Sequence, residues 1–183
     1  EGHAMFQWSD EHQMIREAVK RFVDDEIRPH VDELEHGDLP PYDILRKLFA
    51  TFGMDALARD SFEKQIAREK AITAGEDVAE KQSGDGDGGM SLLPIIELCR
   101  VCPGMVTAMG VSMGLTSAAI MSKGTTRQKE RWALDLLTMD KIGAWAITEP
   151  GSGSDAFGSM RSIARRDGDE YVLNGSKTFI TNG

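Results

Sequence analysis

The chain has 183 residues, 40% of them hydrophobic and 28% charged, which is enough for one domain with a sizeable core or for one domain and the start of another. Its net charge of −9 excludes binding to nucleic acid through a basic surface, because no excess of Lys and Arg can neutralise phosphates. Residues 1–5 are typical of an expression-tag remnant, and no basic-then-apolar leader follows them. We therefore expect a cytoplasmic protein, or a mitochondrial matrix protein if the source is eukaryotic.

Two amphipathic helices are predicted first. Ser9 is a good N-cap, and apolar residues then recur at helical spacing as far as Ile27, after which Pro29 is expected to stop the helix. Pro41 suits the first turn of a second helix, and Gly53 can end it. The apolar residues of both helices are assigned to the core: Ile15, Ala18, Val19, Phe22 and Ile27, then Ile44, Leu45, Leu48, Phe49 and Phe52.

The stretch 55–89 has a different composition. It is charged, has few large apolar residues and closes on alternating glycine and aspartate at 84–89. Such a segment cannot offset its ordering entropy by burial, so a mobile loop is predicted. The alternation is similar to a calcium loop, but the closing glutamate of that motif is missing, which disfavours calcium.

Helical patterns resume after the loop. One helix is predicted over 92–102, and Pro103-Gly104 separates it from the next. A final helix is predicted after residues 125–128, which have the pattern of a capping box. Its inner face is expected to carry Trp132, Leu136 and Leu137. The chain is therefore expected to be all helix as far as Asp140.

The uncharged stretch 101–122 is long enough to span a membrane, but its proline, glycines and hydroxyl residues favour the buried central helix of a bundle. Gly110 and Gly114 would let a neighbouring helix or a ligand tail come close. Cys99 and Cys102 form a lone C-x-x-C, which is interpreted as two buried helix residues and not as a redox or metal site. Three methionines are assigned to the core, with a pocket for a flexible chain as the alternative: Met105, Met109 and Met113.

After residue 140 the pattern changes to β-structure. Short strands are predicted at Ile142–Thr148, Ser162–Arg166, Tyr171–Leu173 and Lys177–Thr181. They are joined by Asp-Gly-Asp at 167–169 and by Asn174-Gly175, the strongest hairpin signal. A sheet that ends here has an unpaired edge and an unfinished apolar face. We therefore expect a helical domain over 6–140 and the incomplete start of a β-domain over 141–183.

The segment from Trp145 to Asp155, WAITEPGSGSD, is the first candidate for ligand chemistry. Its chain leaves a strand at Pro150 and enters a loop in which Gly151 and Gly153 can expose amide donors. Short polar side chains surround these amides. Such a loop can bind the edge of a planar heterocycle or a phosphate, or it can be a tight connection whose hydroxyls satisfy the turn. Loop chemistry alone favours neither interpretation.

A second segment, NGSKTFITNG at 174–183, follows about twenty residues later. Together the two segments resemble the flavin-binding signatures of the acyl-CoA dehydrogenase family, T-E-P-x-x-G-S-D and N-G-x-K-x-(W/F)-I-T-N. Residues 124–132 resemble the helix-opening motif that precedes the family's β-barrel. The resemblance implies a mainly α chain with an N-terminal helical bundle, followed by the first strands of a β-barrel domain. The family's C-terminal helical domain is absent from these residues.

The resemblance also implies FAD as the cofactor and gives roles to particular residues. Flavin contacts are expected from Trp145, Ile147, Thr148, Gly153, Ser154, Phe179, Ile180 and Thr181. Phe179 would stack on the isoalloxazine ring, and the Thr181 hydroxyl would hydrogen-bond flavin N5 and stabilise the reduced flavin. Ser154 would also reach the CoA part of the substrate. Glu149 is expected to be structural, and no metal ligand is assigned.

The implied activity is α,β-dehydrogenation of an acyl-CoA thioester in fatty-acid metabolism, with electrons passed to an electron-transfer flavoprotein. The catalytic glutamate would belong to the C-terminal domain, so no catalytic residue is assigned here, and these 183 residues alone are expected to be inactive. The full-length protein is expected to form homodimers or homotetramers, with no membrane partner. Two alternatives stay open: a non-catalytic flavin- and CoA-binding subunit, and an oxygen-reactive relative on the same fold.

Overall fold

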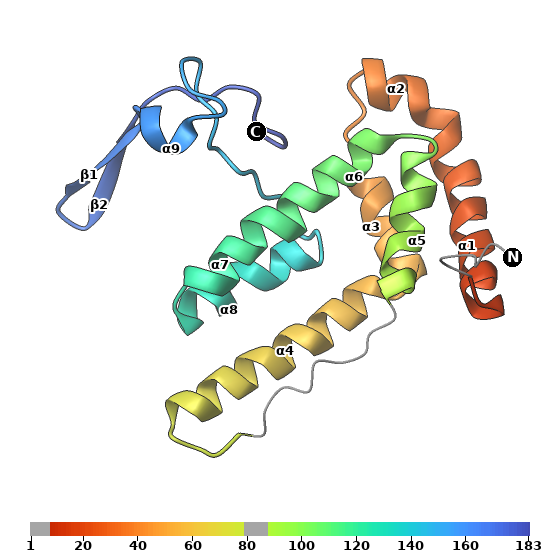
Figure 1. The fold of residues 1–183 in the computed structure, drawn as a ribbon, viewed down its shortest axis with the longest axis horizontal. Helices are drawn as coiled ribbons and strands as arrows, with labels where there is room; N and C mark the ends of the chain where they lie inside the picture. The colour runs from red at the N-terminus through yellow and green to blue at the C-terminus, as the bar shows by residue number, and fades with distance from the viewer. Residues whose placement is uncertain (1–7, 79–87) are drawn as a thin grey trace, which may run out of the picture.

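A computed structural model describes residues 8–78 and 88–183, which are mainly helical with one antiparallel hairpin near the C-terminus (Figure 1). The predicted tag remnant at 1–5 lies outside the described residues. The elements are α1 (Asp10–Phe22), a π-helical turn (Val23–Ile27), a 3-10 turn (Arg28–His30), α2 (Val31–His36), α3 (Tyr42–Thr51), α4 (Met54–Thr73), α5 (Gly88–Cys99), α6 (Pro103–Gly110), a second π-helical turn (Val111–Thr116), α7 (Ser117–Lys123), α8 (Thr126–Leu137), α9 (Ala156–Ser159), β1 (Ile163–Asp167) and β2 (Glu170–Asn174).

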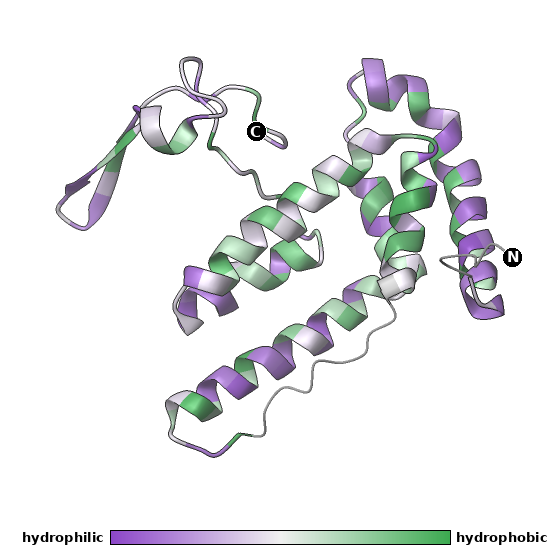
Figure 2. Cartoon of the chain, in the orientation of Figure 1, coloured by the Kyte–Doolittle hydropathy of each residue, from purple (hydrophilic) through white to green (hydrophobic). Residues whose placement is uncertain are grey.

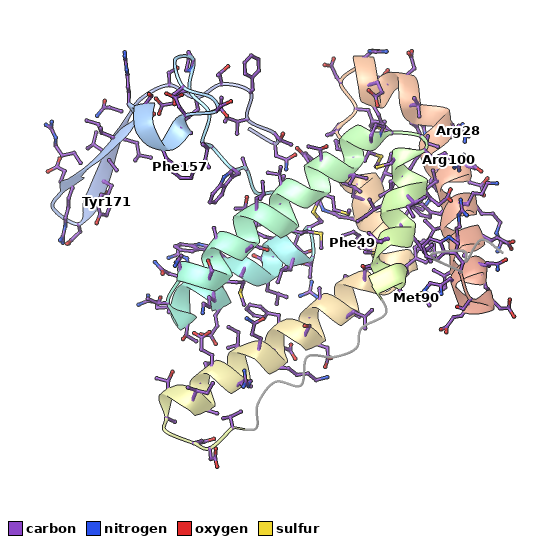
Figure 3. All side chains as sticks on the ribbon, viewed as in Figure 1. Arg28, Phe49, Met90, Arg100, Phe157 and Tyr171 are labelled. Atoms are coloured by element: carbon purple, nitrogen blue, oxygen red, sulfur yellow. The ribbon has the colours of Figure 1, made fainter. Side chains whose placement is uncertain are left out.

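Two helices, α1 and α8, begin at side-chain caps. Ser9 and Thr125 each form the predicted N-cap, and both are capping boxes with the third residue of their helix. Hydrophobic residues predominate along α5, hydrophilic residues predominate on α2, and α1 and the hairpin carry both kinds (Figure 2). Phe49 lies inside the helical bundle (Figure 3) and is 1% exposed. The main core cluster comprises Val19, Phe22, Val23, Ile27, Leu45, Leu48, Phe49, Leu98, Cys102, Met105, Met109 and Met139.

The predicted loop over 55–89 is wrong where α4 forms a helix of 20 residues. The segment is rich in Ala, Glu, Lys and Arg, which favour helix even where few apolar residues define a face. Phe62 and Ile66, one turn apart, are buried and pack in a second cluster with Ala133 of α8. Ion pairs from α4 to α8 add to this contact. Most of the glycine-aspartate run lies outside the described residues.

Pro29 does not end the first helical segment, contrary to the prediction. The chain passes through the π-helical turn and a 3-10 turn into α2, and Pro29 lies in the first positions of that 3-10 turn. A proline there loses no hydrogen bond, because the first amides of a helical turn have no partner within it. Gly53 does follow the end of α3 as predicted, with a left-handed φ of 65°.

The helix formed by α6, the second π-helical turn and α7 is buried on one side only. It runs from Pro103 to Lys123 and is long and apolar enough to cross a membrane, a property that core helices of soluble proteins share. Met105 and Met109 belong to the main core, which confirms the core interpretation. The predicted burial on all sides is wrong, since only 28% of its apolar window is buried against the described residues.

Two smaller burial predictions are also wrong. Cys99 is exposed, whereas Cys102 is buried as predicted. Trp132 is 39% exposed and lies beside the guanidinium of Arg131, whereas Leu136 is 7% exposed and does face inward. The residues next to them, Leu98 and Ala133, are fully buried instead. Apolar spacing alone does not show which of two adjacent apolar residues faces inward.

Two of the four predicted strands form a regular ladder. Strands β1 and β2 are antiparallel, with Ile163 opposite Asn174 and Asp167 opposite Glu170. The turn between them is at Gly168, which has a φ of 59°, and this confirms the predicted Asp-Gly-Asp connection at 167–169. The second predicted hairpin, at Asn174-Gly175, is wrong, because no strand of the described residues follows β2. The segments 142–148 and 177–181 are not strands, because no strand of the described chain lies beside either to complete a ladder.

A buried methionine gives a first prediction. Met139, just after α8, is fully buried with a left-handed φ of 61°, which is uncommon for a side chain with a Cβ. Met139→Ala should lower the free energy of unfolding by about 3 kcal/mol through lost packing. Met139→Gly loses the same packing but relieves about 1 kcal/mol of backbone strain. Denaturant unfolding should therefore find the glycine variant at least as stable as the alanine variant, the reverse of the order expected inside a helix.

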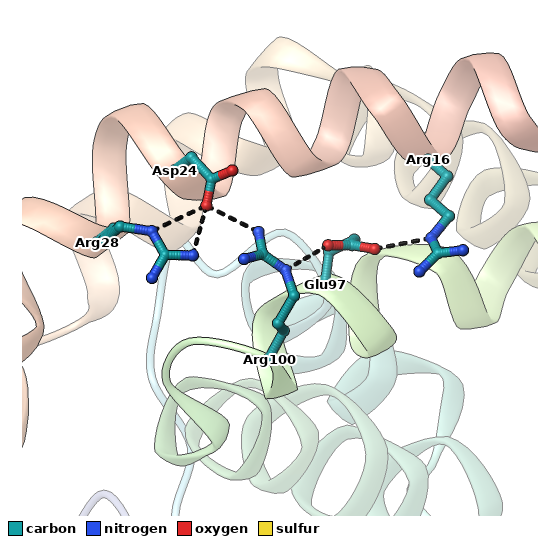
Figure 4. Close-up of polar contacts among 5 residues, drawn as sticks. All are labelled: Arg16, Asp24, Arg28, Glu97 and Arg100. Carbon is teal, nitrogen blue, oxygen red and sulfur yellow. Dashed lines mark hydrogen bonds and ion pairs between the residues drawn. The ribbon is translucent and has the colours of Figure 1, made fainter.

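A chain of ion pairs joins α1 to α5 (Figure 4). Glu97 is fully buried and accepts hydrogen bonds of 2.8 Å from both Arg16 and Arg100, and Arg100 and Arg28 both bond Asp24. Burial alone would raise the pKa of Glu97, but the two arginines outweigh it and hold the pKa below its ordinary value of 4.5. The buried carboxylate is thus charged and fully paired.

Glu97→Gln should lower the free energy of unfolding by about 2 kcal/mol. This cost is smaller than the cost of removing one partner of a fully buried ion pair, because Arg16 and Arg100 are both partly exposed. A carboxyl with a lowered pKa contributes stability above its unfolded pKa and loses it as pH falls through the folded value. The gap in unfolding temperature between wild type and variant should therefore narrow as pH falls below about 4.5. A gap that stays constant across this range would contradict the ionised pair.

Candidate functional site

The two signature segments come together in the structure although they are distant in sequence. The Thr178 amide donates to the Thr148 carbonyl at 3.1 Å. The Lys177 Nζ donates to the Ile147 carbonyl at 3.0 Å and to Glu149 Oε1 at 2.9 Å. The second segment thus lies directly against the first, with Lys177 contacting both its backbone and its carboxylate.

Glu149 lies at the centre of this contact and is 7% exposed. Besides Lys177, its carboxylate accepts the amides of Ser162 at 2.9 Å and Arg161 at 2.7 Å. Hydrogen bonds from Ser162, Arg161 and Lys177 hold the pKa of Glu149 at about 2. Its backbone also exchanges two hydrogen bonds with Ser152, which closes the turn. A carboxylate paired in this way fixes the loop and is a poor proton acceptor at neutral pH.

Several hydrogen-bond donors in the outer part of the loop 145–155 have no acceptor within the described residues. A Cβ added at Gly151 or Gly153 would meet no atom within 4 Å, and Ser154 is exposed. Within residues 8–78 and 88–183, the amides of Gly153 and Ser154 and the amide and hydroxyl of Thr148 have no hydrogen-bond acceptor. Donors held on a fixed turn and left unpaired are available to a ligand.

Two aromatic signature residues are exposed. Trp145 is 39% exposed, and Phe179 is 93% exposed with a left-handed φ of 53°. A bulky residue with positive φ is strained, and such residues cluster at ligand sites. Ile180 and Thr181, which follow, are half-buried. The structure therefore presents the Phe179 ring to solvent, one residue after Thr178, whose amide contacts Thr148 of the loop.

Sequence reasoning missed Asn182, which fixes the end of the second signature against the helices. Its Nδ2 donates to the Ala108 carbonyl at 2.9 Å and to the Gly143 carbonyl at 3.0 Å, and its Oδ1 accepts from the Tyr42 hydroxyl at 3.1 Å. Its φ of 64° is a conformation that asparagine tolerates better than most residues. Its place in the signature was the only available signal, because its partners lie far away in sequence.

A close backbone approach places Gly143, two residues before the first signature, against the helix that runs from Pro103 to Lys123. The Gly143 amide donates to the buried Ser112 hydroxyl at 3.0 Å, inside the second π-helical turn. A Cβ at Gly143 would come within 2.8 Å of the Thr116 side chain. Only glycine lets the chain pass this closely, and π-helical turns of this kind are frequent at functional sites.

Comparison with known families agrees with this geometry. The sequence profile described as "Acyl-CoA dehydrogenase, N-terminal domain" matches residues 9–60 and 73–140. The profile described as "Acyl-CoA dehydrogenase, middle domain" matches residues 144–183. The first profile alone covers more than half of the chain.

Individual relatives give the same result. The short-chain specific acyl-CoA dehydrogenase of Clostridium acetobutylicum is 30% identical over 178 residues, which cover 97% of this chain and 42% of the relative. An acyl-CoA dehydrogenase structure from Geobacillus kaustophilus is 31% identical with a TM-score of 0.69, covering 96% of this chain and 41% of the other. An acyl-CoA dehydrogenase from Bacillus anthracis complexed with FAD is 32% identical with a TM-score of 0.61, covering 96% and 27%. This chain therefore spans less than half of these relatives, and it belongs to the acyl-CoA dehydrogenase family.

Proposed function

We propose that this chain supplies the flavin-holding part of an FAD-dependent acyl-CoA dehydrogenase, which converts an acyl-CoA thioester to the 2,3-enoyl-CoA. The observation that carries the proposal is the contact between the two signatures through Thr148, Thr178, Lys177 and Glu149. Family membership supports the reaction class. We also propose that the helical domain ends near residue 140, with the β-domain beginning at 141.

The free groups on this face fit a flavin. Unpaired amides at Thr148 and Gly153 suit the oxygen- and nitrogen-bearing edge of a planar heterocycle, and the exposed Phe179 ring offers a stacking surface. The isoalloxazine ring would be lined by Trp145, Ile147 and Ile180. Ser154 would contact both the flavin and the CoA part of the substrate. FAD would supply the hydride acceptor. The Thr181 hydroxyl, which has no partner in the described chain, would donate to N5 and favour the reduced form.

Glu149 is not the base in this proposal, because its oxygens already accept three hydrogen bonds and its pKa is about 2. The glutamate that removes the α-proton is expected from another part of the full-length protein. We further propose that the enzyme works in the cytoplasm or mitochondrial matrix as a homodimer or homotetramer, and that an electron-transfer flavoprotein accepts its electrons.

The test is anaerobic titration of the full-length, flavin-loaded protein with butyryl-CoA, chosen because of the short-chain relative. We expect bleaching of the oxidised flavin absorbance and formation of the 2,3-enoyl product. A bound flavin that no acyl-CoA bleaches would refute the proposal in favour of a non-catalytic flavin- and CoA-binding subunit, and a preparation without flavin would refute the flavin site itself. Rapid reoxidation of the bleached flavin when air is then admitted would instead identify an oxygen-reactive relative.

A further inference from the structure

The two most exposed large apolar side chains of the described residues lie within the second signature segment and two residues after the first. Phe157 is 97% exposed and Phe179 is 93% exposed, whereas Phe22, Phe49 and Phe62 are buried. A single exposed apolar residue is ordinary on a protein surface. Two exposed phenylalanines, one within the second signature and one just after the first, are informative, because exposed aromatic faces can stack on planar ligand groups. The proposed function gives Phe179 such a partner and leaves Phe157 without one.

Phe157 projects from a turn that is held on both sides. The Asp155 carbonyl accepts the Gly158 amide at 2.8 Å and the Ser159 amide at 3.1 Å, and the Ser159 hydroxyl also bonds the Asp155 carboxylate. Ala156, the preceding residue, is 6% exposed and fixes the inner side of the turn. Figure 3 shows Phe157 on α9, apart from the helical bundle. An aromatic ring on an ordered turn loses little backbone freedom when a ligand binds, which favours affinity.

The neighbours of Phe157 indicate the chemistry of its ligand. Ser154, the residue expected to reach CoA, is three positions before it. Arg161 follows four positions later, and Glu149 holds its backbone amide while the residue itself stays exposed. Arg161 and Arg165 have no ion-pair partner in the part of the chain that the structure describes. This combination of an aromatic face and unpaired guanidinium groups suits a planar base that carries phosphates.

We infer that Phe157 stacks on the adenine ring of the acyl-CoA substrate, with Arg161 contacting a CoA phosphate. The inference rests on the proposed function, which places the thioester at the flavin and leads the CoA chain past Ser154. The adenine of FAD has the same chemistry, so the experiment must separate the two sources. Phe157 is then a residue that determines substrate affinity and takes no part in the chemical step.

The test compares two thioesters in the full-length, flavin-loaded protein. Phe157→Ala should raise KM for butyryl-CoA about tenfold, the size expected for losing one stacked base, with kcat unchanged. KM for butyryl-pantetheine, which lacks the adenine and its phosphates, should not change. Phe157→Tyr should restore the wild-type KM, and Tyr171→Ala, which removes another exposed aromatic on β2, should have no effect.

Several outcomes would overturn the inference. An equal rise in KM for both thioesters would show that Phe157 acts on the reacting part of the site. A weaker affinity for FAD with an unchanged KM for butyryl-CoA would assign the stack to the flavin adenine. A lower unfolding temperature with unchanged KM would make Phe157 a packing residue of the full-length protein. Failure of wild type to react with either thioester would refute the proposed function itself, a distinct result.

Discussion

Glu149→Gln is expected to lower the affinity of the full-length protein for FAD about tenfold or more. The carboxylate accepts two backbone amides and the Lys177 ammonium, and these charge-assisted bonds hold the two signatures together. Glutamine keeps the shape of the side chain but has no charge, and its amide nitrogen cannot accept a hydrogen bond. One donor therefore loses its partner, and Lys177 is left without its counterion in a site where it is only 25% exposed.

The same substitution should change the response to pH. The pKa of Glu149 is about 2 in the folded chain against an ordinary value of 4.5. A lowered pKa means that the contribution to stability is complete above about 4.5 and is lost as pH falls toward 2. The difference in unfolding temperature between wild type and Glu149→Gln should thus be largest near neutral pH and shrink in acid.

Flavin retention and thermal unfolding measure these effects. Glu170→Gln is the matched control, since Glu170 is an exposed glutamate on β2 and should retain full flavin affinity. A double-mutant cycle with Lys177→Met should show strong coupling, because both substitutions remove the same ion pair. Wild-type flavin affinity in Glu149→Gln, or additive effects in the cycle, would show that this contact does not form the site.

Asn182→Ala is expected to destabilise the protein by about 2 kcal/mol or more and to slow flavin reduction by substrate. Three hydrogen bonds are lost at once, from the Tyr42 hydroxyl and to the carbonyls of Ala108 and Gly143. Alanine is also less tolerant than asparagine of a φ of 64°. Because Asn182 directly follows Thr181, a shift here would move the hydroxyl that is proposed to bond flavin N5.

Denaturant unfolding and stopped-flow absorbance measure the two effects of Asn182→Ala. Asn174→Ala serves as the control, because Asn174 is an exposed residue at the end of β2 and should change neither quantity appreciably. Asn182→Gly separates the causes, since glycine accepts the positive φ but makes none of the side-chain bonds. If the glycine variant behaves like wild type, the hydrogen bonds are not what positions this segment.

The features that sequence predicted well are those with local causes. Capping boxes at Ser9 and Thr125 depend on residues three apart, and the apolar stripes of α1 and α3 depend on helical spacing, so both could be identified directly. Helix α4 was missed because its stability comes from propensity and from a contact with α8, neither of which produces an apolar stripe. The segment 142–148 was predicted as a strand because it is a short apolar run, but within the described residues only Ile142 of this segment packs against the main core and no strand lies beside it.

Some features of the candidate site could likewise be predicted from the sequence, and others depend on tertiary packing. Resemblance to a family identified the two signatures, and the role of Glu149 as a structural carboxylate agrees with its hydrogen bonds. No local pattern indicated that Asn182 would contact Ala108 and Tyr42, because those contacts depend on how α3 and α6 pack. The exposure of Phe157 likewise follows from the turn at α9, which the sequence of the loop did not reveal.

A crystal structure of the full-length protein with FAD tests the central claim most directly, namely that the two signatures form one flavin site. We expect the isoalloxazine ring against Phe179, its polar edge at the amides near Thr148, and the Thr181 hydroxyl within hydrogen-bond distance of N5. The contact between Glu149 and Lys177 should persist with the flavin bound. A flavin bound away from these residues, or signatures that separate when it binds, would contradict the account.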